Sequence, residues 1–184
     1  MEKKPVKHPN DAQCRALWDQ YETPEHIRKH CEAVALVACA IGSALNDAGK
    51  NLDIDLIYAA GMLHDLVRLS KDHEKEGAEI MRGLGYDGEA DIISVHMHYD
   101  PFSQIEEVTE TDMVCLGDRT VIEHGFVGVN RRYQHIIDKA IRMGRPEAEA
   151  VILEKRVDVY RFVNQIEELT GKSLEDIVSG VHVD

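Results

Sequence analysis

Apolar residues recur every three or four positions through most of this chain, the spacing that places them on one face of an α-helix. No stretch shows the regular alternation of apolar and polar residues that is typical of a half-buried strand. Cap and turn residues divide the pattern into segments, so the sequence predicts an all-α fold, one helical bundle of about seven to nine helices. The predicted helices span about residues 11–21, 23–49, 53–68, 70–85, 87–100, 109–122, 130–143 and 146–171, with a short helix from 173.

The composition indicates one domain. Of the 184 residues, 43% are hydrophobic and only 5% are aromatic, which suffices for one sizeable core built mainly from aliphatic side chains. Residues 1–10 are polar, contain two prolines and are predicted to be disordered. We therefore expect a single domain over about residues 11–180.

The charge and the apolar runs restrict the cellular setting. The 34 acidic residues exceed the 21 Lys and Arg residues, and the net charge of -13 argues against nucleic acid or an anionic membrane as a partner. No signal-peptide core follows Met1, and the longest nearly apolar run, 33–45, is too short to span a bilayer. We expect a soluble, cytoplasmic protein.

The four cysteines form no C-x-x-C pair and are expected to be reduced and structural.

Six ionisable residues fall on the apolar faces of the predicted helices. Taken alone, a His-Asp pair at a helix end is most often a polar terminus, and one buried histidine is usually a satisfied core residue. A buried carboxylate, however, is unfavourable unless it is paired or bound to a cation, and several inward histidines also need partners. One shared metal site satisfies the whole set, which comprises His30, His64, Asp65, His73, His96 and Asp118.

The fourth predicted helix contains two histidines, of which one faces inward. Ile92 and Ile93 fix the apolar face that His96 shares, whereas His98 lies about 200° further round the helix.

Nitrogen and oxygen ligands without cysteine favour Fe, Mn, Zn, Co or Ni over a metal that needs thiolate ligands, and Mg is a further possible ion. One or two divalent ions are expected.

With these residues in this order, the sequence resembles the HD-domain superfamily of metal-dependent phosphohydrolases, in its six-ligand form H…HD…H…H…D. The local contexts also resemble the family: PEHIRKHCEAVALVA, AAGMLHDLVR and MVCLGDRTV surround His30, the His64-Asp65 pair and Asp118. The resemblance covers about residues 22–125, and the helices of about 130–180 lie beyond it. It implies one ion held by His30, His64, Asp65 and Asp118, and a second held by His73 and His96, with Asp65 bridging the two.

The chain departs from the family pattern at one charged position. Many members carry Lys three residues after the HD aspartate, where this chain has Arg68, which can bind a phosphate as a fork. Arg119, Arg131 and Arg132 are further candidates for binding an anion, although each also fits a solvated surface charge. Because no glycine-rich phosphate loop is present, nucleotide recognition would rest on side chains and metal.

The resemblance implies a phosphohydrolase that acts on a small-molecule phosphate, with a nucleotide as the expected substrate. Metal ions would polarise a phosphoryl oxygen and activate a water, and Asp65 would bridge the ions and orient that water. Two alternatives remain open: a di-iron oxygenase with the same six ligands, and a nucleotide-sensing module that keeps the metal for structure. The order of ligands does not separate them, and it leaves the substrate, the metal and a homodimer undecided.

Overall fold

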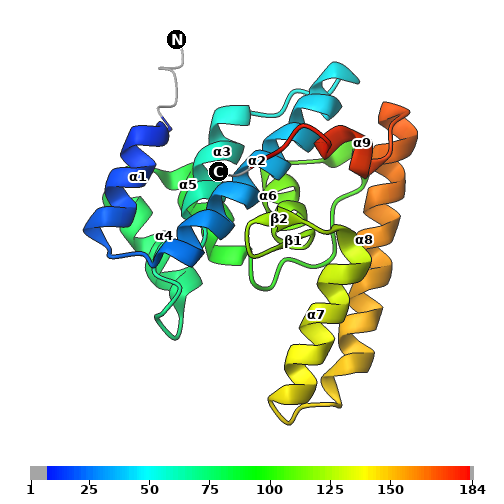
Figure 1. Ribbon diagram of the computed structural model, residues 1–184. Coiled ribbons are helices and arrows are strands. Elements are labelled where there is room, and N and C mark those ends of the chain that lie inside the picture. Colours follow the sequence, from blue (N-terminus) through cyan, green and yellow to red (C-terminus); the bar gives the residue numbers. More distant parts are fainter. Residues whose placement is uncertain (1–7, 183–184) are drawn as a thin grey trace.

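The computed structural model describes residues 8–182, and helices dominate this part of the chain (Figure 1). The prediction of an all-α fold is confirmed. A 3-10 turn, η1, and a two-stranded hairpin, β1–β2, complete the structure. In chain order the elements are α1 (Asp11–Gln20), α2 (Glu25–Asp47), α3 (Ile54–Leu63), α4 (His73–Gly83), α5 (Asp87–Val95), η1 (Ile105–Glu107), α6 (Glu110–Asp118), β1 (Val121–Ile122), β2 (Gly125–Phe126), α7 (Gly128–Arg142), α8 (Ala148–Thr170) and α9 (Leu174–Val178).

Local hydrogen bonds explain where several helices begin and end. Asp53 accepts hydrogen bonds from the first backbone N–H groups of α3, and Thr109 forms a capping box with Asp112 at the start of α6. Helix α8 ends at Gly171, whose φ of 68° is in the left-handed region that glycine adopts without strain. These three boundaries therefore follow cap residues that the sequence displays.

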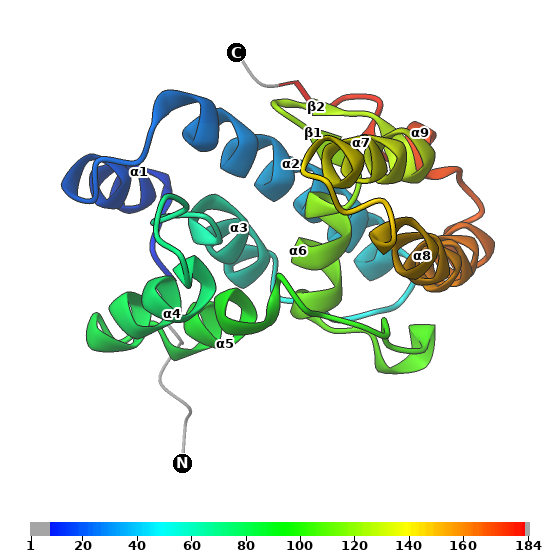
Figure 2. The same ribbon diagram turned by 90° about the horizontal axis from the view of Figure 1, so that it is seen from below.

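Helix α2 is the centre of the fold and packs directly on α3 and α6 (Figure 2). Two glycines permit this close approach. A Cβ atom at Gly61 would lie 2.7 Å from the Cα of Ala35, and one at Gly117 would lie 2.9 Å from the carbonyl oxygen of Val34. One apolar cluster fills the side of α2 toward α6 and α8, and another fills the side toward α1, α3, α4 and α5. The site described below lies where α2, α3 and α6 meet.

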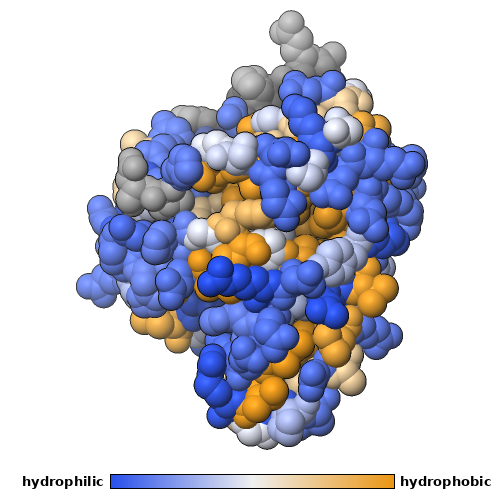
Figure 3. All heavy atoms as spheres, turned by 45° about the vertical axis from the view of Figure 1, so that its right-hand side comes forward, coloured by the Kyte–Doolittle hydropathy of each residue, from blue (hydrophilic) through white to orange (hydrophobic). Residues whose placement is uncertain are grey.

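Helices α7 and α8 form an antiparallel pair that extends below the rest of the molecule in Figure 1. Their packed faces are apolar, but Ile141, Val151 and Val157 are exposed on the outside. Apolar areas interrupt the hydrophilic surface in the lower half of Figure 3. We call residues 128–170 the α7–α8 hairpin.

One expectation needs correction, and one element was not predicted. The segment predicted to be disordered, 1–10, lies mostly outside the described residues, but residues 8–10 are packed: Nδ1 of His8 is 2.6 Å from Oε1 of Glu89, and Asn10 caps α1. The β1–β2 hairpin was not predicted, because two residues per strand are too few to show an alternating pattern. No described helix is both long enough and apolar enough to cross a membrane.

Candidate metal centre

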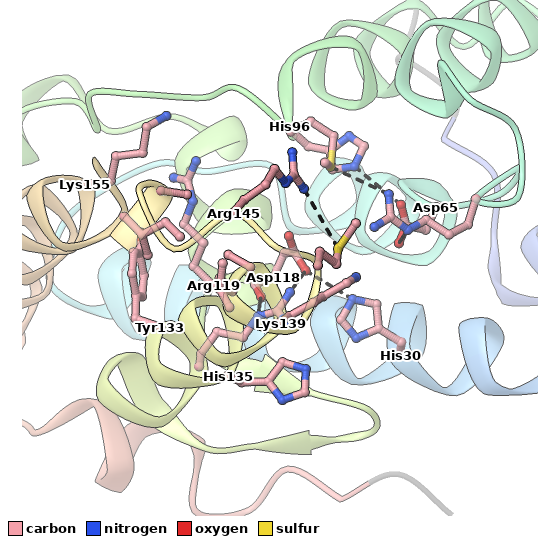
Figure 4. A pocket seen from close by; sticks show the side chains of 18 of the residues that line it. His30, Asp65, His96, Asp118, Arg119, Tyr133, His135, Lys139, Arg145 and Lys155 are labelled. Atoms are coloured by element: carbon pink, nitrogen blue, oxygen red, sulfur yellow. Dashed lines mark hydrogen bonds and ion pairs between the residues drawn. The ribbon is translucent and has the colours of Figure 1, made fainter. Parts of the chain in front are cut away.

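Asp65 lies at the centre of the predicted ligands and is only 6% exposed. Its Oδ1 atom is 3.2 Å from Nε2 of His73 and 3.5 Å from Nε2 of His96, while its Oδ2 atom is 3.7 Å from Nε2 of His64. Three imidazole rings therefore face one carboxylate. Figure 4 shows Asp65 and His96 across from His30 and Asp118 in the same cavity.

The potential ligands form two groups that share Asp65. His30, His64 and Asp65 each offer an atom within 4.8 Å of the other two, and so do Asp65, His73 and His96. The sixth predicted residue, Asp118, adjoins the first group, because its Oδ1 is 3.1 Å from Nε2 of His30. All six residues are thus brought together, in two groups that could each hold a metal ion.

Three of the four histidines are oriented by backbone carbonyls. Nδ1 of His64 lies 2.8 Å from the carbonyl oxygen of Gly61, and Nδ1 of His96 lies 2.7 Å from that of Ile93. Nδ1 of His30 lies 3.1 Å from the carbonyl oxygen of Glu123. A carbonyl oxygen only accepts hydrogen bonds, so each Nδ1 carries a proton, and Nε2 is the atom that each ring turns toward the centre, able to bind a cation once it is deprotonated.

Several buried polar atoms at this centre make no hydrogen bond to the described residues. They are Nε2 of His64, Nε2 of His96 and Oδ1 of Asp65. Lone pairs and carboxylate oxygens do not satisfy one another, and leaving them buried without a partner is costly. A divalent cation would satisfy all three, so the residues fit a metal ion.

The protonation states agree with this interpretation. Burial opposes ionisation of Asp65, but the neighbouring His64, His73 and His96 together with Arg68 hold the pKa of Asp65 well below its usual range. Burial likewise opposes ionisation of Asp118, and the hydrogen bond from His30 and the charge of Arg132 hold its pKa low. Burial lowers the pKa of His64 to about 4. At neutral pH the carboxylates are charged and His64 is neutral, as metal binding requires.

Contacts from α1, from α2 and from the connection between them fix the segment that carries the His64-Asp65 pair. The indole Nε1 of Trp18 donates a 2.9 Å hydrogen bond to the carbonyl of Met62, and Oγ1 of Thr23 donates a 2.7 Å bond to that of Leu66. The packing of Gly61 on α2 brings the His64 ring to 5.5 Å from that of His30, measured between centroids. These interactions connect residues far apart in the sequence. The small residues 59–61 indicate a close approach of another backbone, but the helical pattern does not show which residues meet there.

His96 and His98 differ in position as expected. His96 is 3% exposed and belongs to the group around Asp65, whereas His98 is exposed. Both His64 and His96 stand just after a helix end, since α3 ends at Leu63 and α5 at Val95. The predicted helices were too long at these points. Each imidazole ring hydrogen bonds to the backbone carbonyl three residues before it, and in a longer helix that carbonyl would accept from a backbone N–H instead.

The predicted anion-binding arginines have different environments. Arg68 places Nη1 2.7 Å from Nε2 of His73 and Nε 3.4 Å from Oδ2 of Asp65. Arg132 hydrogen bonds to Asp118, and Arg119 donates to the carbonyl of Tyr99. All three line the cavity over the centre, but Arg131 is exposed and does not line it.

The cavity above the centre has a volume of about 540 Å³ and is lined in part by residues of the α7–α8 hairpin (Figure 4). Its only acidic lining residues are Asp65 and Asp118, and its apolar lining includes Ile136 and Ile152. Its cationic lining residues are Arg68, Arg119, Arg132, Lys139, Arg145 and Lys155, of which the sequence pattern had singled out the first three. The cavity is therefore suited to an anion.

Comparisons with known proteins agree with the geometry. The family model of the HD domain matches residues 27–179, which include the α7–α8 hairpin as well as the six clustered residues. An uncharacterized protein of Methanocaldococcus jannaschii is 36% identical over 74 residues, which cover 38% of this chain and 43% of that relative. The chain thus spans less than half the length of this curated relative, and no solved structure matches. Because the family match covers most of the chain, the protein belongs to the HD-domain superfamily, whose members bind divalent metal ions.

Proposed function

We propose that this protein hydrolyses a phosphate ester or anhydride of a small molecule, with a nucleotide as the substrate class. The observation that carries the proposal is the contrast between the cavity and the rest of the chain. A protein of net charge -13 places six Lys and Arg side chains around the buried carboxylate of Asp65, the partly buried carboxylate of Asp118 and a set of histidine nitrogens. Such a cavity attracts an anion and provides ligands for a divalent ion.

The two groups around Asp65 would hold the metal. His30, His64, Asp65 and Asp118 would bind one ion, and Asp65, His73 and His96 would bind another. A divalent ion held there supplies Lewis acidity, which polarises a phosphoryl oxygen and lowers the pKa of a coordinated water. Zn²⁺, Mn²⁺ and Fe²⁺ all accept nitrogen and oxygen ligands of this kind.

The chain itself contributes charge and orientation. Asp65 is ionised and central, so its carboxylate would accept a hydrogen bond from the attacking water and direct it toward phosphorus. Arg68 would turn its guanidinium to two phosphoryl oxygens, because it lines the cavity three residues after Asp65 and is only half-buried. Asp65 and Arg68 are the residues to which we assign catalysis.

The apolar part of the cavity supports a nucleotide rather than a bare phosphate. Ile27, Ile136 and Ile152 line the same space as the cations, and Tyr133 adds an aromatic ring. A cavity of about 540 Å³ is within the range of small-molecule sites, which combine apolar walls with a few polar groups. A base and sugar would pack on these walls while the phosphate faces the carboxylate and histidines.

Release of inorganic phosphate from a panel of nucleotides and simple phosphomonoesters, with Mn²⁺ or Zn²⁺ added, tests the proposal. Wild-type protein should release phosphate from at least one nucleotide, and Asp65→Ala should abolish this release. Arg131→Ala is the matched control, since Arg131 is exposed outside the cavity and its loss should leave the rate unchanged. Equal rates for wild type and Asp65→Ala would contradict the proposed function.

A further inference from the structure

The six cations of the cavity differ in whether they already have a carboxylate partner. Arg68 is paired with Asp65 at 3.4 Å, Arg132 with Asp118 at 3.2 Å, and Lys155 with Asp100 at 3.4 Å. The remaining cations have no ion pair within 4.0 Å among the described residues; these are Arg119, Lys139 and Arg145.

The guanidinium of Arg119 nevertheless contacts other groups of the protein. Its guanidinium lies 4.9 Å from the centroid of the Phe102 ring and donates to the carbonyl of Tyr99. Arg145, by comparison, has only a weak contact with the sulfur of Met143 at 3.9 Å. Within the part of the chain that the structure describes, the ammonium group of Lys139 forms no hydrogen bond or ion pair with another side chain. Lys139 and Arg145 are therefore the two cavity cations whose charge the protein itself leaves uncompensated.

The geometry of α7 directs these charges to the metal centre. Arg132, Ile136, Lys139 and Met143 all line the cavity, and this spacing of three or four residues defines one face of the helix. Arg132 contacts Asp118, and Lys139 follows on the same face about 10 Å further along the helix axis. Arg145 extends this face beyond the end of α7, and Figure 4 shows both side chains over the cavity.

We propose that Lys139 and Arg145 form a second anion subsite on the α7–α8 hairpin, which binds a phosphoryl group of the substrate other than the one that is cleaved. This inference rests on the proposed function and specifies its substrate class: a molecule with at least two phosphoryl groups. Two cations match the double charge of a phosphate better than the single charge of a carboxylate. Both side chains are exposed, and apolar residues such as Ile136 line the same cavity.

Binding of α,ω-alkylenediphosphonates to the Mn²⁺-loaded protein tests the subsite without any turnover. Isothermal titration calorimetry with linkers of increasing length, and with methylphosphonate as the single-group probe, should find one length that binds more tightly than methylphosphonate. The variant Lys139→Ala/Arg145→Ala should lose this advantage, by about tenfold or more in affinity for the loss of charge-assisted hydrogen bonds. Its affinity for methylphosphonate should stay unchanged.

Arg142→Ala is the matched control, because Arg142 is an exposed cation of the same hairpin that does not line the cavity. It should bind every probe as wild type does. Equal affinity of the double variant and wild type for all diphosphonates would overturn the subsite, even if the protein releases phosphate from nucleotides. A loss confined to the double variant would establish the subsite even if no hydrolysis is found, so the two proposals can fail separately.

Discussion

Arg132 holds Asp118 at two points: its Nε donates a 3.0 Å hydrogen bond to the backbone carbonyl of Asp118, and its Nη2 lies 3.2 Å from the carboxylate Oδ1. This fork connects the α7–α8 hairpin to the last residue of α6. The same carboxylate oxygen faces His30, so the fork fixes the orientation of a predicted metal ligand.

Arg132→Ala should therefore weaken Mn²⁺ binding by about 10–100-fold, the usual cost of removing a group that orients a metal ligand. Calorimetric titration of the metal-free protein with Mn²⁺ measures this directly. Arg131→Ala, one residue away on the exposed side of α7, should bind Mn²⁺ as wild type does. Wild-type affinity in Arg132→Ala would show that Asp118 is oriented without the fork.

Gly61→Ala should destabilise the fold by about 1–3 kcal/mol, because the added Cβ would lie 2.7 Å from the Cα of Ala35 and force α3 away from α2. Urea unfolding measures the change. Gly83→Ala serves as the control: nothing lies within 4 Å of its Cβ position, so removing a helical glycine there should stabilise by about 0.5–1 kcal/mol. If Gly61→Ala is as stable as wild type, the helices are not in close contact at this point.

The stability of the metal-free protein should be greatest near pH 6.5. Burial lowers the pKa of His64 to about 4, so between pH 6.5 and 4 this histidine is protonated in the unfolded chain but not in the folded chain. The free energy of unfolding therefore falls as the pH decreases from 6.5 toward 4. Burial alone would also lower the pKa of His30 and His96, but Asp118 and Asp65 raise both above 6.5. Their contribution is complete below pH 6.5 and is lost as the pH rises through the raised values.

Urea unfolding at a series of pH values, with a chelator present, would trace this profile. Saturating Mn²⁺ should remove the loss above pH 6.5, since the metal then replaces the protons on the imidazoles. The double variant His30→Asn/His96→Asn should lack the same loss without metal. A stability that keeps rising above pH 6.5 in the wild-type protein would contradict the assigned pKa directions.

His96→Ala should bind fewer Mn²⁺ ions than wild type, or bind them more weakly, whereas His98→Ala should bind them unchanged. The reason is that Nε2 of His96 is buried and directed toward Asp65, while His98 is exposed. Elemental analysis of the purified variants after equilibrium dialysis gives the number of ions per chain. Loss of metal in His98→Ala alone would mean that α5 presents the other histidine.

The helices could be predicted because they follow from local spacing, and the gathering of the six potential ligands could be predicted because buried ionisable groups need a shared partner, as the family resemblance also implies. An apolar stripe with a period of three or four residues fixes which face of a helix is buried, and His30, His73 and Asp118 lie on such stripes. The ends of α3 and α5 could not be predicted in the same way. There the rings of His64 and His96 bond to backbone carbonyls, a competition that the hydrophobic pattern does not display.

The remaining parts of the site depend on contacts between distant segments. The carbonyl that orients His30 belongs to Glu123, whose positive φ of 55° arises in the turn of the short β1–β2 hairpin. No property of the glutamate side chain indicates this role. Lys139 and Arg145 appear as ordinary surface cations in the sequence, and only the folding of the α7–α8 hairpin over the centre brings them to the cavity.

We propose above that the centre around Asp65 hydrolyses a phosphate ester or anhydride by Lewis-acid chemistry. The most direct test is phosphate release under nitrogen by protein in which Zn²⁺ or Mn²⁺ replaces iron, with Asp65→Ala measured alongside. Hydrolysis needs no change of oxidation state, so we predict that protein loaded with either ion releases phosphate at least as fast as iron-loaded protein and that Asp65→Ala releases none. Turnover that occurs only with iron and consumes dioxygen, as in an oxygenase that uses the same six ligands, would contradict it.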